Sequence, residues 1–179
     1  MFIKILFNIS ICFISYSVYY SMIISAKDLY TPWSMNAKPY PKNFCISDSS
    51  FFCPSKKMIK DEIFPRYWDW MKALKWTKWM HKWDCDNFAD AFKLFACGYY
   101  EEVIDSTANG IAVGVIHYNA DARAESGISG GHAINIIYSE GEKNDDGSDH
   151  YDLLFLEPQN GNFYHLAPHE FDSIWTVYI

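Results

Sequence analysis

The sequence predicts an α+β fold in which helices come first and an antiparallel β-sheet follows. In the helical part, Phe88, Phe92, Phe95 and Tyr99 recur at intervals of four, three and four residues, which is the spacing of one helix face. After residue 110, short runs rich in Ile, Val, Tyr and Leu are separated by turn-forming residues, which is typical of strands. Half of the residues are hydrophobic, so one domain with its own core is expected and a second full domain is not.

The N-terminal region, residues 1–26, predicts a signal peptide or a membrane anchor. Lys4 supplies a positive start, residues 5–24 are largely apolar, and Ile24-Ser25-Ala26 offers small residues for cleavage. The apolar run is close to the length of about 20 residues that crosses a membrane, so both alternatives stay open. Residues 27–179 are then a single domain with a Pro- and Trp-rich lead-in, secreted or periplasmic, or else anchored and facing outward.

Charge is distributed unevenly along the chain, whose formal net charge is −7. Residues 27–98 have an excess of Lys and Arg, whereas residues 99–179 are strongly acidic. Because phosphate binding needs a basic footprint, the overall sign argues against a nucleic-acid partner. A membrane is expected to be contacted only through an uncleaved N-terminal segment.

Two helices are expected ahead of the one that carries the candidate site. A Pro-rich lead-in over residues 30–54 is expected to wrap the domain. Ser55 is a typical N-cap for a short helix that Pro65 interrupts. A second helix is expected over residues 66–81, and its tryptophans are interpreted as a buried face with lysines in water. Contact with membranes or sugars is the alternative.

The third expected helix, residues 84–96, places a cysteine at its start. Asp84 is a good N-cap and Gly98 a plausible stop, so Cys85 lies in the first turn. A helix N-terminus favours the thiolate, which is the nucleophilic form, whereas the carboxylates of Asp84 and Asp86 disfavour it.

The other cysteines of the expected domain suggest structural roles. Cys45 and Cys53 could pair across an irregular segment in an oxidising compartment or stay as free thiols, and both alternatives are open. Cys97 is expected to be a small buried hydrophobe.

The expected strands bring two polar residues together. The strands are residues 111–118, 133–138, 151–156 and 174–179. His132 precedes the second strand and Glu157 follows the third. If these strands are antiparallel neighbours joined by a polar turn at residues 144–149, the two side chains become adjacent. The imidazole could then bond Glu157 through one nitrogen and face Cys85 through the other.

A cysteine-dependent active site needs a thiol nucleophile, its base and a group that orients the base. These three parts are supplied by Cys85, His132 and Glu157. The sequence therefore predicts an exported, cysteine-dependent acyl-transfer enzyme, most directly a peptidase acting on a peptide or protein. Its thiolate would attack an amide carbonyl, and His132 would protonate the leaving amine. The alternatives are a peptidoglycan amidase, a transglutaminase-like enzyme, or a catalytically silent binding module that uses its Trp-rich helix or acidic sheet.

Three sequence strings around these residues resemble a known family. They are Asp84-Cys85-Asp86 with Phe88-Ala89, Gly131-His132-Ala133-Ile134-Asn135, and Glu157-Pro158-Gln159. They are similar to the C-terminal domain of the fungal Marasmius oreades agglutinin and its relatives, a papain-like cysteine protease domain. The resemblance covers residues 83–161 and implies a papain-like fold.

The resemblance also implies residue roles. Cys85 would be the nucleophile, His132 the base and then the acid, Glu157 the orienting residue, and Gln159 a polar group able to support the site or the oxyanion. The family's activity is calcium-dependent, which implies a cation held near Asp84 and Asp86.

The chain departs from the family in two respects. The agglutinin carries a sugar-binding β-trefoil before this domain, whereas this chain has a leader and a short lead-in, so galactose recognition is not implied. Papain-like enzymes place a Gln six residues before the nucleophile, and that position here is Trp79.

Overall fold

The computed structural model describes residues 22–34, 41–104, 106–120, 130–143 and 150–179. The predicted leader up to residue 21 and the predicted polar turn at 144–149 lie outside these residues. Within the described part of the chain, no helix combines the length and the apolar character needed to cross a membrane.

In chain order, the elements are β1 (Ile23–Ser25), η1 (Asp28–Tyr30), α1 (Thr31–Ser34), β2 (Asn43–Cys45), β3 (Ser50–Phe52), α2 (Lys56–Met58), the π-helical segment η2 (Ile59–Ile63), α3 (Phe64–Leu74), α4 (Cys85–Val103), β4 (Gly110–Ile111), β5 (Val113–Ala120), β6 (Gly130–Glu140), β7 (Tyr151–Glu157), β8 (Asn162–Tyr164), α5 (Pro168–Asp172) and β9 (Thr176–Tyr178).

The fold is α+β with mixed sheets. In the described residues, one sheet has the strand order β1-β3-β4 and the other the order β2-β9-β5-β6-β7-β8. The pairs β5–β6, β6–β7 and β5–β9 are antiparallel, as the sequence predicts. The pairs β2–β9 and β3–β4 are parallel, so the sheets as a whole are mixed, whereas the four predicted strands pair antiparallel with one another. Both parallel pairs join segments far apart in the chain, which local residue patterns do not reveal.

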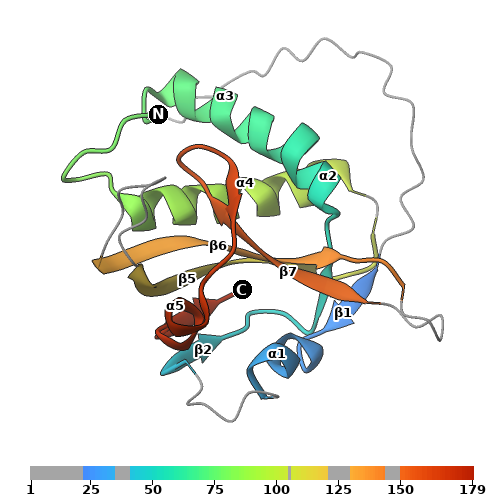
Figure 1. Ribbon diagram of the computed structural model, residues 1–179. Coiled ribbons are helices and arrows are strands. Elements are labelled where there is room, and N and C mark those ends of the chain that lie inside the picture. The colour runs from blue at the N-terminus through green and yellow to red at the C-terminus, as the bar shows by residue number, and fades with distance from the viewer. Residues whose placement is uncertain (1–21, 35–40, 105, 121–129, 144–149) are drawn as a thin grey trace.

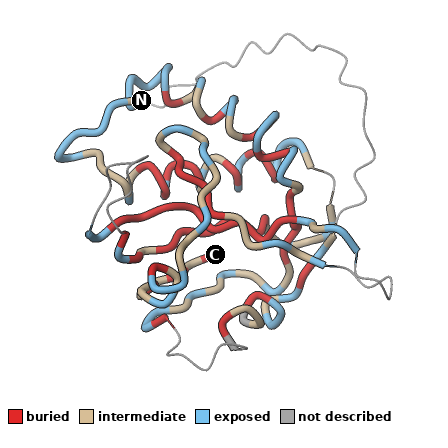
Figure 2. The backbone as a smooth tube through the Cα atoms, in the orientation of Figure 1, coloured by how far each residue is buried: buried red, intermediate tan, exposed pale blue. Residues whose placement is uncertain are grey.

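Helices and short elements cover opposite faces of the larger sheet (Figure 1). On one face, α3 and α4 pack through Tyr67, Phe88 and Phe92. On the other, Trp33 stacks on Phe171, with ring centroids 4.8 Å apart. Figure 2 shows that the buried residues follow the central strands and run along α4. The two cores hold β5 and β6 in place and thereby fix the position of the candidate site.

The start of the first helix agrees with the sequence, but its predicted interruption is wrong. Ser55 caps the helix, because its Oγ accepts a hydrogen bond from the Met58 N–H at 3.1 Å. Pro65 does not interrupt the chain's helical path, which passes from the π-helical segment η2 into α3 with helical backbone angles at Ile63 and Phe64.

The second helix ends earlier than predicted, at Leu74 instead of residue 81. Lys75 has a left-handed conformation with φ of 61°, and its N–H donates to the Lys72 carbonyl at 3.0 Å, which ends the helix. The interpretation of a buried tryptophan face is therefore wrong beyond Leu74. Trp76 and Trp79 lie in the following loop and are 39% and 60% exposed.

The third helix is longer than predicted. It runs past Gly98 to Val103. The reason is packing, because Tyr99 and Tyr100 bury their rings against the core, and this outweighs the cost of about 1 kcal/mol of a helical glycine.

The last residues of the predicted leader belong to the described fold. Ile24 of β1 is buried, and β1 pairs with β3 from Ile23 to Ser25. Cleavage after Ala26 would remove this strand, whereas cleavage before Ile23 would keep it. The boundary itself stays a prediction.

The described cysteines are all free thiols. Of the two alternatives for Cys45 and Cys53, the structure has the unpaired one, with Cys45 exposed and Cys53 buried. Burial raises the pKa of Cys53 to about 12. Cys97 is exposed, so the prediction that it is a buried hydrophobe is wrong.

Candidate functional site

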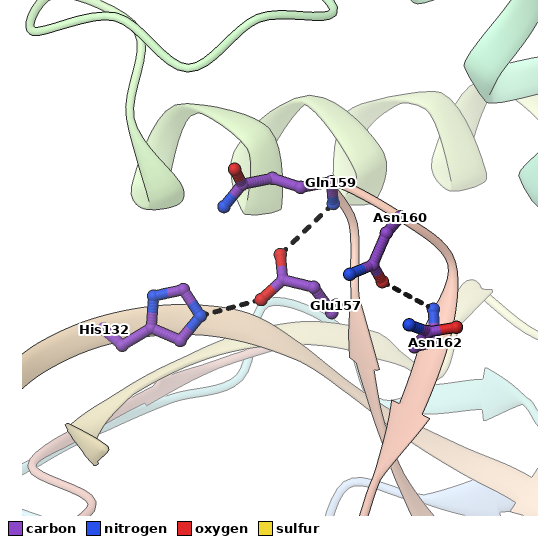
Figure 3. Close-up of polar contacts among 5 residues, drawn as sticks. All are labelled: His132, Glu157, Gln159, Asn160 and Asn162. Carbon is purple, nitrogen blue, oxygen red and sulfur yellow. Dashed lines mark hydrogen bonds and ion pairs between the residues drawn. The ribbon is translucent and has the colours of Figure 1, made fainter. Parts of the chain in front are cut away.

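A buried imidazole–carboxylate pair forms where β6 begins and β7 ends. The β6–β7 pairing stops at Asn135 and Leu156, whereas the other edge of β7 stays paired with β8 through Glu157. In this gap, Nε2 of His132 lies 2.8 Å from Oε2 of Glu157, and the side chains are only 4% and 1% exposed (Figure 3). The structure thus brings His132 and Glu157 together.

The other oxygen of the carboxylate is also held. Glu157 Oε1 accepts a hydrogen bond from the backbone N–H of Gln159 at 3.2 Å (Figure 3). Gln159 therefore supports the pair through its backbone, whereas the sequence suggested its side chain. With both oxygens bonded, Glu157 has a fixed orientation toward His132.

A tight turn after Glu157 makes this geometry possible. The Gly161 N–H donates to the Glu157 carbonyl at 2.8 Å, and Gly161 has a φ of 77°. A Cβ at Gly161 would lie 2.5 Å from the Phe64 ring, so only glycine fits here.

Cys85 reaches the pair from the start of α4. Asp84 is the N-cap, and its N–H donates to Oδ1 of Asn87 at 3.2 Å. The Cys85 side chain acts on His132 and contributes to raising the pKa of the ring. Because Nε2 of the ring faces Glu157, Nδ1 is the nitrogen left for the sulfur.

The position of α4 over the sheet is fixed by a buried amide. Nδ2 of Asn135 donates to the carbonyls of Ala89 and Gly114, at 2.9 and 3.0 Å. These two bonds tie the first turns of α4 to β6 and β5 at once. The start of α4 is thereby held beside the start of β6.

The surroundings of His132 change its proton affinity. Burial alone would lower its pKa, but the hydrogen bonds with Cys85 and Glu157, together with their charges, outweigh burial and raise it to about 9. The ring therefore carries a proton at neutral pH.

Asp84 and Asp86, the predicted metal ligands, influence each other's pKa. The interaction with Asp86 raises the pKa of Asp84, and the same interaction lowers the pKa of Asp86. Carboxylate oxygens suit calcium, but the ion takes about six to eight oxygens. Among the described residues, no group of three or more His, Cys, Asp or Glu side chains could hold a metal. The calcium prediction stays a prediction.

The structure places the predicted metal ligand Asp86 in a set whose other members sequence reasoning missed. We call it the aromatic–carboxylate surface; it consists of His117, Trp175, Tyr178, Asp86 and Asp90. The His117 ring lies 6.1 Å from the Trp175 ring and 6.4 Å from the Tyr178 ring, at interplanar angles of 36° and 29°. The Tyr178 hydroxyl donates to the Asp90 carboxylate.

The charges on this surface are linked. Burial raises the pKa of Asp90, and the charge of Asp86 adds to this effect, whereas His117 acts in the opposite direction. Lys93 lies 5.0 Å above the Tyr178 ring.

The aromatic–carboxylate surface is continuous with the Cys85 site. Cys85 and Tyr178 pack against the same small cluster of Ala89, Val115 and Ala133. On the other side, the Trp175 ring passes so close to Gly131 that a Cβ there would lie 3.7 Å from it. Gly131 directly precedes His132, so the rings extend from one side of the site to the other.

Only part of this surface had a sequence signal. Asp86 and Asp90 are four residues apart and therefore share a helix face. Trp175 and Tyr178 are brought to His117 by the pairing of β9 with β5, which no local pattern predicts.

The arrangement is suited to binding a polar, ring-shaped ligand. Half-exposed aromatic rings can stack on the apolar face of such a ring, and carboxylates accept hydrogen bonds from its hydroxyl groups. In the described part of the chain, Nδ1 of His117 is buried without a hydrogen-bond partner.

Comparisons with known proteins give a fold but no family. No family model and no curated protein sequence matches the chain. Among solved structures, it resembles one described as a PSL1a–E64 complex, with a TM-score of 0.63, 19% identity, and coverage of 88% of this chain and 51% of that chain.

A second neighbour is the Polyporus squamosus lectin bound to the human-type influenza-binding epitope Neu5Acα2-6Galβ1-4GlcNAc. Its TM-score is 0.61 with 19% identity, and the match covers 88% of this chain and 49% of that chain. The chain thus spans about half the length of these two structures and shares the fold of the part that it matches.

These neighbours correct the predicted activity. The second neighbour is described as a lectin and not as a peptidase, which contradicts the prediction of a cysteine-type peptidase and the terms hydrolase and thiol protease. The structure does bring Cys85, His132 and Glu157 together. A buried ion-pair network of this kind also orders a binding site, and a shifted pKa does not by itself mean catalysis.

Proposed function

We propose that this protein is a carbohydrate-binding module whose ligand contacts the aromatic–carboxylate surface. The observation that carries the proposal is the row of Trp175, His117 and Tyr178 rings beside the carboxylates of Asp86 and Asp90. Stacking rings and hydroxyl acceptors within one ligand's reach are what a sugar requires. The likeness in fold to a lectin that was solved with a bound trisaccharide supports this class of ligand.

In this proposal, one side of the binding site is a rigid group of polar residues, which are Cys85, His132, Glu157 and Gln159. Gln159 fixes Glu157, Glu157 fixes His132, and the protonated ring presents positive charge beside Cys85. The packing of α4 against β6 serves in this proposal as architecture without turnover. Asp86 serves as a hydroxyl acceptor in this account.

Export belongs to the same proposal. A secreted or periplasmic protein meets polysaccharides and glycoconjugates outside the cell, where such a module has its ligands. The partner is then a carbohydrate and not a peptide substrate.

The proposal is tested by calorimetric titration of the purified protein with Neu5Acα2-6Galβ1-4GlcNAc and with a panel of neutral oligosaccharides. Trp175→Ala removes a stacking ring and is expected to weaken binding of the preferred sugar about tenfold, or about 1.4 kcal/mol. Asp90→Asn removes a charged acceptor and is expected to weaken binding about fivefold.

The matched control is Asp69→Asn. Asp69 lies on α3 with its side chain 76% exposed, and it is expected to leave the affinity unchanged. Equal affinity of the wild type and Trp175→Ala would contradict the proposed site. Hydrolysis of a peptide by the wild type, abolished in Cys85→Ala, would contradict the proposed function.

A further inference from the structure

The loop between α3 and α4 exposes large apolar side chains. We call residues 75–83 the Trp loop. Trp79 is 60% exposed, Met80 49% and Trp76 39%, and the adjoining Leu74 is 37% exposed. The loop projects at the left of Figure 1, and Figure 2 colours most of it as exposed. So many apolar side chains gathered on one loop are typical of a contact surface.

Specific contacts hold the Trp loop in shape. Met80 and Trp83 exchange two backbone hydrogen bonds of 2.8 Å. The ring of Trp76 packs on that of Trp83, with centroids 4.5 Å apart, and Trp83 in turn contacts Phe88 of α4. The outward display of Trp79 and Met80 is therefore a feature of a built structure.

The charge of the Trp loop is opposite to that of the chain. Lys75, Lys78 and Lys82 are exposed, and residues 75–83 contain no Asp or Glu. The whole chain has a formal net charge of −7. The positive loop attracts negatively charged partners, although the negative charge of the rest of the protein repels them. A partner drawn to this loop must therefore carry negative charge.

We propose that the Trp loop docks on the surface of a bilayer that contains anionic lipids. Indole rings settle at the headgroup level, lysines are drawn to anionic headgroups, and Leu74 and Met80 can reach the acyl boundary. A sugar ligand would not account for these two aliphatic side chains. The inference is independent of the proposed function, and because α4 begins directly after the loop, docking holds the Cys85 site close to the membrane.

The experiment uses the full chain and vesicles of phosphatidylcholine with or without phosphatidylserine. The double variant Lys78→Gln/Lys82→Gln is expected to lose partitioning into the anionic vesicles by about fivefold for each lysine at low salt. Raising the salt concentration is expected to remove the difference between the two kinds of vesicle.

A second readout reports on the loop itself. Vesicles of anionic lipid with bromine-labelled acyl chains are expected to quench part of the tryptophan fluorescence. Trp79→Phe keeps an apolar ring but removes the indole, so this variant is expected to lose most of that quenching. Any binding through residues 1–26 is the same in all variants and cancels in the comparison.

The control is Leu94→Ser on α4, a residue that is 68% exposed outside the Trp loop. It is expected to leave partitioning within twofold of the wild type. Equal partitioning of the wild type into neutral and anionic vesicles would overturn the proposal, as would unchanged quenching in Trp79→Phe. Either result would leave the carbohydrate titration unaffected, so the two proposals fail separately.

Discussion

The Cys85 site and the Trp loop are adjacent in the chain, but the site buries charged side chains whereas the loop exposes apolar ones. At the site, the charged groups of His132 and Glu157 are withdrawn from water. In the loop, Trp79 and Met80 are left in water. Both depart from the usual rule of apolar inside and polar outside.

The two regions differ in what offsets the free-energy cost of placing these side chains where they lie. The buried pair is compensated internally, by the 2.8 Å bond and by the Gln159 N–H on Glu157. In the exposed loop, the compensation for Trp79 comes from the proposed docking on a bilayer. Substitutions at the site should therefore alter stability, whereas substitutions in the loop should alter binding.

The largest effect is expected for Glu157→Ala. This substitution leaves the buried His132 ring without its carboxylate and is expected to lower the free energy of unfolding by about 3 to 5 kcal/mol. Urea denaturation measures it. Asp152→Ala is the control, because the Asp152 side chain is 57% exposed beside His150 and its loss should cost no more than about 0.5 kcal/mol. Similar losses in the two variants would remove the contrast between site and surface.

The next effect concerns pH. The pKa of His132 is about 9 in the folded protein and about 6.5 in the unfolded chain, so the folded state binds the proton more tightly. The resulting stabilisation, about 3 kcal/mol, is complete below the unfolded pKa and is lost as the pH rises through the folded pKa.

Urea denaturation in buffers on either side of this window measures the pH effect. His132→Gln should flatten the decline, and the exposed His150→Gln should retain it. A profile that is already flat in the wild type would show that His132 is not held in its protonated form.

A third effect concerns thiol access. Cys53 is 1% exposed and burial raises its pKa to about 12, whereas Cys85 is partly exposed. Iodoacetamide should therefore label Cys85 at least about 100-fold faster than Cys53 at neutral pH. Mass spectrometry of the labelled peptides measures both rates, and equal rates would contradict the structure.

The same labelling tests the predicted calcium site. A cation at Asp84 and Asp86 would change the charge beside Cys85, so the labelling rate of Cys85 should rise with added calcium and fall with a chelator. An unchanged rate would count against calcium binding there.

The smallest effect is expected in the Trp loop. Trp79→Ser should change the free energy of unfolding by less than about 0.5 kcal/mol, because the side chain is mostly in water. Urea denaturation again measures it. A loss of several kcal/mol would mean that the loop is part of the core.

Sequence reasoning succeeded where local signals agree with the fold. The Asp84 N-cap, the start of α4 and the order of β5, β6 and β7 all follow from residue patterns, and the closeness of His132 and Glu157 follows from that order. It failed where distant segments decide the structure. The left-handed Lys75 that ends α3 has no distinctive sequence signal, and Trp175 and Tyr178 reach the site only because β9 pairs with β5.

The function was harder to infer than the geometry. A thiol, an imidazole and a carboxylate in contact define where a proton can move, but they do not determine whether a substrate bond is broken. The class of ligand depends on side chains such as His117 and Trp175. These two rings are neighbours only because the folded sheet brings them together.

The central claim is that the surface beside Cys85 binds a carbohydrate. The most direct test is calorimetric titration of the wild type and Trp175→Ala with the same oligosaccharide panel. We predict saturable binding of at least one oligosaccharide by the wild type and binding about tenfold weaker in the variant. If no oligosaccharide binds, or if wild type and variant bind equally, the claim is contradicted.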